Sequence, residues 1–253
     1  MDILDQLRCV LGHDAVLTGP ETAKWDHDWT GAYQSTPLAV LRPRNTDDVS
    51  AIMKIAHRTK TPVVPVSGNT GLNGGAQAQG ALLLSVDRLN TISRLDVQGR
   101  TATVGAGVIL SDLHTAAEDH DLIFPLTFGA RGSAMIGGVL STNAGGSNVL
   151  RYGNTRDLVL GIEVVMANGD IMNLMGALHK DNSGLNLKHL MIGAEGTLGV
   201  ITQAVVKLFA KPQAYATAMV ATSSLGAALD LLHRVQSEAG GGVEAFEYMP
   251  RDY

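Results

Sequence analysis

Short apolar runs alternate with segments of helical spacing over the first two hundred or so residues. The runs are typical of buried strands and cover residues 38–41, 62–66, 81–86, 101–104, 161–167 and 199–208. Val49, Ile52 and Ala56 recur at the spacing of one helix face, and a second helix is expected over about 111–120. We expect Thr46 to cap the first helix and Asn168–Gly169 to form a hairpin turn.

The pattern changes near Lys211–Pro212. The residues beyond it predict a strand over 215–221, a helix over 223–238 and a second strand starting at 243. One such β-α-β unit can hardly close a hydrophobic core by itself. We therefore expect one domain over residues 1–211 and, over 212–253, the beginning of a second, truncated domain.

The composition excludes several protein classes. The net charge of −5, with charges scattered along the chain, argues against a nucleic-acid-binding surface. No apolar run approaches the roughly 18 residues of a membrane span, and the N-terminus lacks the regions of a signal peptide, so a cytoplasmic location is expected. The single cysteine, Cys9, forbids an internal disulfide and has apolar neighbours typical of a core position. Asp26–His27–Asp28 is better interpreted as a solvated loop than as metal ligands, and we expect no metal site.

Glycine is both abundant and clustered. The chain has 29 glycines, and 14 of them lie between Gly68 and Gly146, where average usage would give about 5 or 6. The first cluster, Gly68–Gly75, directly follows an apolar strand and contains no basic residue. Converging backbone N–H groups in such a turn can hold a pyrophosphate without Lys or Arg. An ordinary glycine-rich turn is the alternative.

Two further segments are rich in small residues. Ile136–Gly146 would be destabilised as a helix interior by about 1 kcal/mol for each glycine, whereas a flat cofactor lying against the backbone would require them. Ile192–Thr202 brings a third glycine-rich turn to the start of a strand. The common nucleotide motifs are absent: Gly105–Ala106–Gly107 follows a strand, but Leu110 stands where a dinucleotide-binding fingerprint needs glycine.

In these three segments the sequence resembles the FAD-linked oxidase superfamily of the vanillyl-alcohol-oxidase or p-cresol-methylhydroxylase fold. The resemblance covers about residues 41–211 and is strongest to the branch of D-2-hydroxyacid dehydrogenases and glycolate oxidase FAD subunits. Its motifs are Gly68–Gly75, Ile136–Gly138 with Thr142–Gly146, Arg151–Gly153, Lys180–Gly184 and Glu195–Thr202. It implies an α+β, two-subdomain FAD-binding lobe followed by the start of an α/β substrate domain.

The resemblance also implies where the cofactor is bound. Ser67–Gly75 would hold the FAD pyrophosphate, with Ser67 where relatives often have glycine; Ser133–Gly146 would lie along the ribityl chain and flavin; Glu195–Ile201 would close over the adenine or ribityl side. With no cysteine or histidine suited to a covalent link, noncovalent binding is expected. The implied cofactor-binding residues are Ser67, Gly68, Asn69, Thr70, Gly71, Leu72, Gly74, Gly75, Gly132, Ser133, Ile136, Gly137, Gly138, Thr142, Asn143, Ala144, Gly145, Gly146, Glu195, Gly196, Gly199, Val200 and Ile201.

The implied activity is oxidation of a D-2-hydroxy acid, of the D-2-hydroxyglutarate, D-lactate or glycolate type, by hydride transfer to flavin N5. The catalytic and substrate-binding residues are unknown, because family members are about twice as long and carry them beyond the region of Arg251. Two alternatives stay open: a non-catalytic FAD-binding fragment, and a flavin oxidase of another alcohol. An unidentified electron acceptor and a homodimer complete the expectations.

Overall fold

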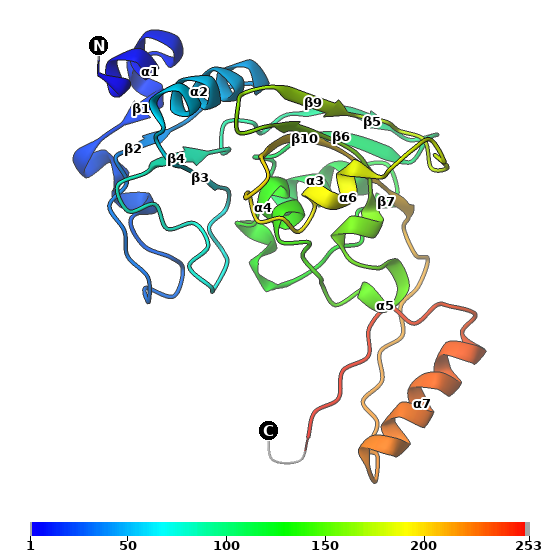
Figure 1. Ribbon diagram of the computed structural model, residues 1–253. Helices are drawn as coiled ribbons and strands as arrows, with labels where there is room; N and C mark the ends of the chain where they lie inside the picture. Colours follow the sequence, from blue (N-terminus) through cyan, green and yellow to red (C-terminus); the bar gives the residue numbers. More distant parts are fainter. Residues whose placement is uncertain (1, 251–253) are drawn as a thin grey trace.

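The computed structural model describes residues 2–250 and contains two separate main sheets (Figure 1). In the first, three strands are parallel and a short edge strand is antiparallel to its neighbour. In spatial order they are β1 (Val16–Leu17), β2 (Ala39–Leu41), β4 (Leu82–Ser85) and β3 (Val63–Val66). Strands β2, β3 and β4 form as expected, because each is an apolar run that the sheet can bury, whereas β1 was not expected.

Two amphipathic helices, α1 (Ile3–Leu11) and α2 (Thr46–Thr59), cover this sheet (Figure 1). Leu7 and Ile52 are fully buried in one core cluster with Leu82. The N-cap of α2 is Asn45 rather than the expected Thr46: the Asn45 side chain accepts a hydrogen bond from Asp48 N at 2.8 Å. Thr46 is instead the first helical residue.

The second sheet is entirely antiparallel. The turn at Asn168–Gly169 forms the expected hairpin between two of its strands, with Gly169 at φ +88°. In spatial order the strands are β5 (Ile92–Asp96), β6 (Thr101–Gly105), β10 (Val200–Lys207), β8 (Val159–Val165) and β9 (Ile171–Leu174). The expected helix near 111–120 is α3 (Leu110–Glu118), which buries Leu110 and Leu113 in the core of this second sheet.

Several short elements complete the lobe. β7 and β11 pair as a two-stranded sheet, and four 3₁₀ helices connect longer elements. Their bounds are β7 (Leu122–Ile123), β11 (Phe209–Ala210), α4 (Ile136–Ser141), α5 (Val149–Tyr152), α6 (Leu187–Met191), η1 (His13–Ala15), η2 (Gly19–Trp25), η3 (Gly129–Gly132) and η4 (Thr155–Leu158).

A buried carboxylate joins α2 to the second sheet. Glu163 on β8 is 9% exposed and accepts hydrogen bonds from the Thr46 hydroxyl at 2.5 Å, the Thr202 hydroxyl at 2.8 Å and the Gln203 amide at 3.1 Å. Close by, the Ser50 hydroxyl donates to the Gly169 carbonyl at 2.6 Å. The relative position of the two sheets is therefore fixed by polar contacts as well as by packing.

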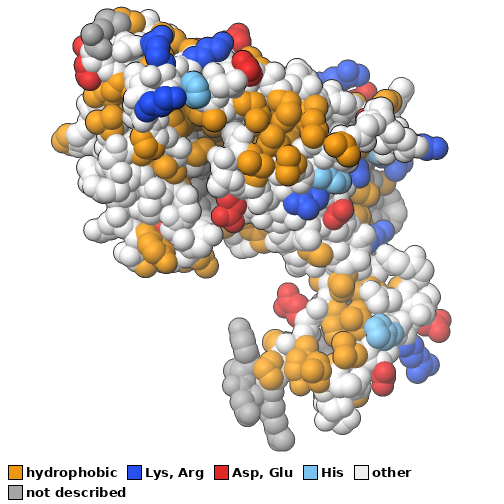
Figure 2. Space-filling model, in the orientation of Figure 1, with side chains coloured by type: hydrophobic (Ala, Val, Ile, Leu, Met, Phe, Trp, Pro, Cys, Tyr) orange, Lys and Arg blue, Asp and Glu red, His pale blue; other side chains and the backbone are white. Residues whose placement is uncertain are grey.

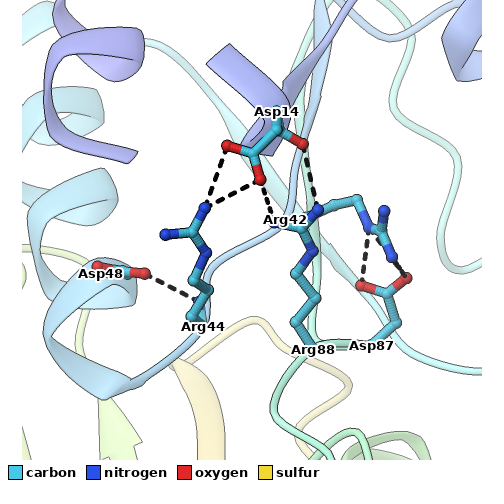
Figure 3. A network of polar contacts seen from close by, with 6 residues as sticks. All are labelled: Asp14, Arg42, Arg44, Asp48, Asp87 and Arg88. Carbon is cyan, nitrogen blue, oxygen red and sulfur yellow. Dashed lines mark hydrogen bonds and ion pairs between the residues drawn. The ribbon is translucent and has the colours of Figure 1, made fainter. Parts of the chain in front are cut away.

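An ion-pair network joins η1 to the segments that follow β2 and β4 of the first sheet (Figure 3). Asp14 lies between Arg44 and Arg88, at 2.9 and 3.2 Å, and Arg42 pairs with Asp87 at 2.9 Å. Hydrogen bonds from Arg44 lower the pKa of the Asp14 carboxyl. Each arginine has an acidic partner, so we interpret this network as a structural clamp rather than an anion site.

Residues 212–250 form an arm that stands away from the lobe (Figure 1). Its helix α7 (Leu225–Glu238) was expected, but the strands expected over 215–221 and from 243 are wrong, because both segments lack regular structure. A strand needs a neighbour for its backbone groups, and neither segment pairs with one in the described residues. Hydrophobic side chains gather on the arm (Figure 2), and Leu225 and Leu229 are exposed.

Two local expectations are also wrong. Cys9 is exposed, because the buried face of α1 carries Leu7 and Leu11, four residues apart, and Cys9 points away from it. Ile136–Ser141 is helical in spite of Gly137 and Gly138, since these glycines allow close packing that a larger residue would prevent, as described next.

Candidate cofactor site

A cleft of about 570 Å³ lies where the two sheets meet. The three glycine-rich segments of the sequence converge on it: the loop after β3, the region of α4, and the turn that leads into β10. β3 belongs to the first sheet and β10 to the second, so each half of the lobe supplies one wall.

Seventeen of the twenty-three expected cofactor-binding residues line this cleft. They are Ser67, Gly68, Asn69, Thr70, Gly71, Leu72, Gly74, Gly75, Gly137, Gly138, Thr142, Ala144, Glu195, Gly196, Gly199, Val200 and Ile201. The remaining six do not: Gly132, Ser133, Ile136, Asn143, Gly145 and Gly146. The fold therefore brings most, but not all, of the expected residues to one surface.

The six residues outside the cleft have other surroundings or roles. Ile136 is 1% exposed in the core of the second sheet. The Asn143 side chain accepts a hydrogen bond from Arg156 N at 2.9 Å. A Cβ on Gly146 would lie 2.4 Å from the Thr127 carbonyl oxygen. Glycine at 146 is thus required by packing within the chain, a reason that the sequence pattern does not distinguish from ligand contact.

Eleven lining residues were not expected. Most adjoin the expected segments, but Asp28 comes from a distant loop that the sequence indicated to be solvated. They are Asp28, Pro65, Val66, Asn73, Ala76, Val86, Phe128, Ala134, Met135, Val139 and Ser141. The acidic triplet Asp26–His27–Asp28 marks this loop in the sequence, but nothing in the triplet indicates that Asp28 lies on a cofactor cleft.

The loop after β3 presents unpaired backbone donors. Asn69 and Gly74 have φ values of +50° and +67°, in the left-handed region. In the described part of the chain, no protein atom accepts a hydrogen bond from the backbone N–H groups of residues 69–74. Consecutive free amides in a turn with left-handed residues form a concave site for an anion.

Contacts between the β3 loop and the α4 region close one side of the cleft. The Ser67 hydroxyl accepts a hydrogen bond from Gly138 N at 3.1 Å. A Cβ on Gly68 would lie 2.2 Å from the Ser133 carbonyl oxygen, and one on Gly137 would lie 2.9 Å from the Ala106 Cβ. Gly68 lets the two halves of the lobe approach each other at the edge of the cleft, and Gly137 lets α4 pack closely on the residue that follows β6.

The third segment turns sharply before it enters β10. Glu195 and Gly196 have φ values of +50° and +77°, and Gly196 faces Pro65 on β3. A Cβ on Gly199 would lie 2.7 Å from Val164 Cγ1. The turn therefore places Val200 and Ile201, the first residues of β10, against the end of β3.

The cleft is mostly apolar, and Asp28 and Glu195 are the only ionisable side chains among residues 2–250 that line it. Asp28 is 1% exposed, and the hydrogen bond from the Thr30 hydroxyl is the main cause that lowers the pKa of its carboxyl. No Lys, Arg, His or Cys of the described part of the chain lines it. Binding of an anionic group would therefore depend on backbone N–H groups and hydroxyls.

Elsewhere the described residues offer little for a metal or a membrane. Among residues 2–250, no three His, Cys, Asp or Glu side chains are grouped so that they could hold a metal ion. Within the same range, none of the helices has the length and apolar character needed to cross a bilayer.

Comparison with known proteins identifies similar sequences. Residues 37–175 match the family model described as FAD binding domain. A D-2-hydroxyglutarate–pyruvate transhydrogenase of Saccharomyces cerevisiae is 39% identical over 252 residues, which are 98% of this chain and 51% of the yeast protein. The glycolate oxidase subunit GlcD of Bacillus subtilis is 42% identical over 205 residues, 81% of this chain and 44% of that protein. The chain spans about half the length of these curated relatives.

Comparison with solved structures identifies proteins of similar fold. A solved alkyldihydroxyacetonephosphate synthase matches with a TM-score of 0.77 at 20% identity, over 94% of this chain and 49% of the synthase chain. The expected α+β fold of the vanillyl-alcohol-oxidase type is confirmed.

Proposed function

Because the chain belongs to the FAD binding domain family, we propose that it binds FAD in the cleft between its two sheets and forms the cofactor-binding part of an oxidoreductase acting on a D-2-hydroxy acid. The observation that carries the proposal is the row of unpaired amides at residues 69–74 on the wall of an apolar cleft of about 570 Å³. FAD combines a diphosphate with two flat ring systems, so it needs both kinds of surface.

The walls of the cleft suggest how the parts of FAD are distributed. The loop Ser67–Gly75 would hold the diphosphate through backbone N–H groups. Ser133–Gly146 would follow the ribityl chain and the flavin, chiefly through the lining members such as Gly138 and Thr142. Glu195–Ile201 would close over the adenine or ribityl side. The six expected residues outside the cleft would support these segments rather than contact the cofactor.

We propose noncovalent binding. Covalent attachment of a flavin needs a reactive side chain such as histidine or cysteine next to the ring, and among the residues that the structure describes neither type lines the cleft. Cys9, the only cysteine, is on α1.

When bound, FAD would accept a hydride from the α-carbon of the hydroxy acid at flavin N5. The chain's own residues would bind and orient the cofactor: the N–H groups of residues 69–74 would donate hydrogen bonds to the diphosphate, and apolar residues such as Val139 and Met135 would exclude water. The groups that bind the substrate carboxylate and accept its hydroxyl proton are proposed to lie outside residues 1–211, in the part of the enzyme that residues 212–253 begin.

Support for the substrate class comes from the relatives. The yeast protein is described as acting on D-2-hydroxyglutarate and the Bacillus protein as a glycolate oxidase subunit. Both substrates are 2-hydroxy acids, and D-lactate is a third member of the class that we include. A second candidate function is FAD binding without turnover by these 253 residues, which the half-length match to the relatives favours. Oxidation of another alcohol, such as a sugar, is the third.

The proposal has three further parts. Reduced FAD must be reoxidised between turnovers, so an electron acceptor is required. We propose a cytoplasmic location, which cell fractionation tests, and a homodimer, which light scattering tests.

The test is to purify the protein, add FAD, remove free flavin and make the solution of the oxidised complex anaerobic. D-2-Hydroxyglutarate, D-lactate and glycolate are added separately, with the L-enantiomers of the first two as controls. Bleaching of the flavin absorbance by a D-2-hydroxy acid supports the enzyme. A stable yellow complex that none of them bleaches supports FAD binding without turnover, and failure to retain FAD contradicts both.

A further inference from the structure

A buried carboxylate lies on the wall of a cleft that we propose to hold an anion. Asp28 is 1% exposed. Its Oδ2 accepts a hydrogen bond from the Thr30 hydroxyl at 2.5 Å, and its Oδ1 accepts one from Tyr33 N at 3.1 Å. Both oxygens are therefore engaged by the loop in which Asp28 itself lies.

A negative charge at this place opposes the binding of a diphosphate, because like charges in a partly desolvated cleft repel each other. The carboxylate must therefore have a compensating use. Its partners indicate that use, since all of them come from residues 30–33 and none from the opposite wall of the cleft.

Asp28 closes the loop of residues 26–36. Besides the two side-chain contacts, Asp28 N donates to the Tyr33 carbonyl at 3.1 Å, and Ser35 N donates to the Asp26 carbonyl at 2.8 Å. His27 and Gln34 form an isolated antiparallel bridge. The loop therefore has a defined shape although it contains no helix or strand.

The loop of residues 26–36 contacts the glycine loop, residues 67–75, at two places, Gly74 and Asn69. The Tyr33 ring packs over Gly74, where an added Cβ would lie 2.7 Å from Tyr33 Cγ. The Asn69 side-chain amide donates to the His27 carbonyl at 3.0 Å. Asn69 and Gly74 are the two left-handed residues that bound the row of unpaired amides.

The same loop also holds the residues that follow the glycine loop. Ala78 N donates to the Ser35 hydroxyl at 3.0 Å, Gly80 N donates to the Thr36 carbonyl at 2.9 Å, and Thr36 N donates to the Gln79 side chain at 2.8 Å. Residues 69–74 make few hydrogen bonds of their own, so their conformation depends on this support.

We propose that Asp28 is a positioning residue for the cofactor: it folds residues 26–36 into the brace that keeps the amides of residues 69–74 directed at the diphosphate. The inference rests on the proposed binding of FAD. It adds a residue and a loop that the glycine motifs do not include.

The direction in which Asp28→Asn changes the affinity for FAD distinguishes the positioning role from a purely electrostatic effect of the carboxylate. Asp28→Asn removes a negative charge from the wall, so electrostatics alone predicts tighter binding of FAD and of ADP. The amide group has only one acceptor oxygen and cannot reproduce both loop contacts. We therefore expect the dissociation constants of FAD and ADP, measured by fluorescence quenching and calorimetry, to rise at least 10-fold together. Equal or tighter binding by the variant overturns the proposal.

Two further variants guard against simple misfolding. Thr30→Val removes the donor to Asp28 Oδ2 at an exposed position and is expected to raise both dissociation constants about 3-fold or more, even if Asp28→Asn does not fold. Asp119→Asn, a matched change at an exposed position outside both the loop and the cleft, should leave both unchanged. Unchanged dissociation constants of FAD and ADP in Thr30→Val overturn the proposal that residues 26–36 keep the amides of residues 69–74 in position.

A double mutant tests the route through Tyr33. If Asp28 acts by holding the Tyr33 ring on Gly74, Asp28→Asn and Tyr33→Ala should be strongly non-additive in FAD affinity. Full additivity contradicts that route. Wild-type protein that binds no FAD refutes the proposed function itself, whereas wild-type binding with unaffected variants refutes only the role of Asp28.

Discussion

The Ser67 hydroxyl accepts a hydrogen bond from Gly138 N at 3.1 Å and so joins the end of β3 to the first turn of α4. The contact connects the two halves of the lobe at the edge of the cleft. Because the oxygen accepts from Gly138, the hydroxyl hydrogen is free to donate to a ligand.

Ser67→Ala should weaken both the protein and its cofactor site. The Gly138 amide loses its partner, so we expect the free energy of unfolding of the apoprotein to fall by about 1 kcal/mol. FAD affinity should fall as well, by several-fold. Urea unfolding and FAD titration measure the two effects. Ser223→Ala, at an exposed serine away from the cleft for which the described structure shows no side-chain hydrogen bond, is the control and should change neither.

Gly74→Ala tests the packing of Tyr33 on the glycine loop. Gly74 and Gly80 have nearly equal φ values, +67° and +66°, but an added Cβ meets the Tyr33 ring only at Gly74. Both substitutions should destabilise the chain by about 1–2 kcal/mol, because alanine is strained in the left-handed region. Only Gly74→Ala should also lower FAD affinity, by 10-fold or more, and Tyr33→Ala should not restore it. Equal FAD affinity in the two alanine variants would show that the ring contact is unimportant.

Glu163→Gln should loosen the junction between α2 and the second sheet. Three donors, Thr46, Thr202 and Gln203, converge on the Glu163 Oε1 atom in a buried place. A neutral amide is a weaker acceptor, so we expect a loss of about 1–3 kcal/mol in unfolding free energy. Asp170→Asn, at an exposed position of the hairpin, should stay within about 0.5 kcal/mol of wild type. An unchanged unfolding free energy of Glu163→Gln would contradict the claim that Glu163 stabilises the junction between α2 and the second sheet.

The stability of the protein should decrease as the pH falls below about 6.5. Burial lowers the pKa of His114 below its ordinary value of 6.5, and its Nε2 lies 2.9 Å from the Leu126 carbonyl oxygen. The unfolded chain therefore binds the proton more readily than the folded one, so this contribution is present above pH 6.5 and is lost as the pH falls through the folded pKa. His114→Gln should flatten the pH dependence of Tm between pH 7 and 5. His120→Gln, at an exposed position, should leave its slope unchanged.

The strands of the lobe and the glycine-rich turns at their ends could be predicted from the sequence because both depend on local signals, whereas the convergence of the three glycine segments was implied only by the family resemblance. Apolar runs such as Leu82–Ser85 predict buried strands, and glycine clusters at strand ends predict turns. Contacts between distant segments could not be predicted. Gly146 and Gly137 are glycine because of Thr127 and Ala106, and this internal packing looks the same in the sequence as contact with a ligand.

The position of Asp28 on the cleft could not be predicted from the sequence either. It lies about forty residues before the glycine loop and contacts only its own loop, so no spacing rule connects it with the cleft. The strand expected over 215–221 failed for a related reason: the apolar run is present, but strand formation depends on a partner that local sequence does not specify.

The most direct test of the account is hydrogen–deuterium exchange across residues 67–80, measured with and without FAD. The backbone N–H groups of residues 69–74 have no protein acceptor in the described structure, so we predict that they exchange rapidly in the apoprotein and become strongly protected when FAD binds. ADP should protect the same amides, because it carries the same diphosphate. Binding of FAD with no change in the exchange of residues 69–74 would contradict the central claim that this loop holds the cofactor.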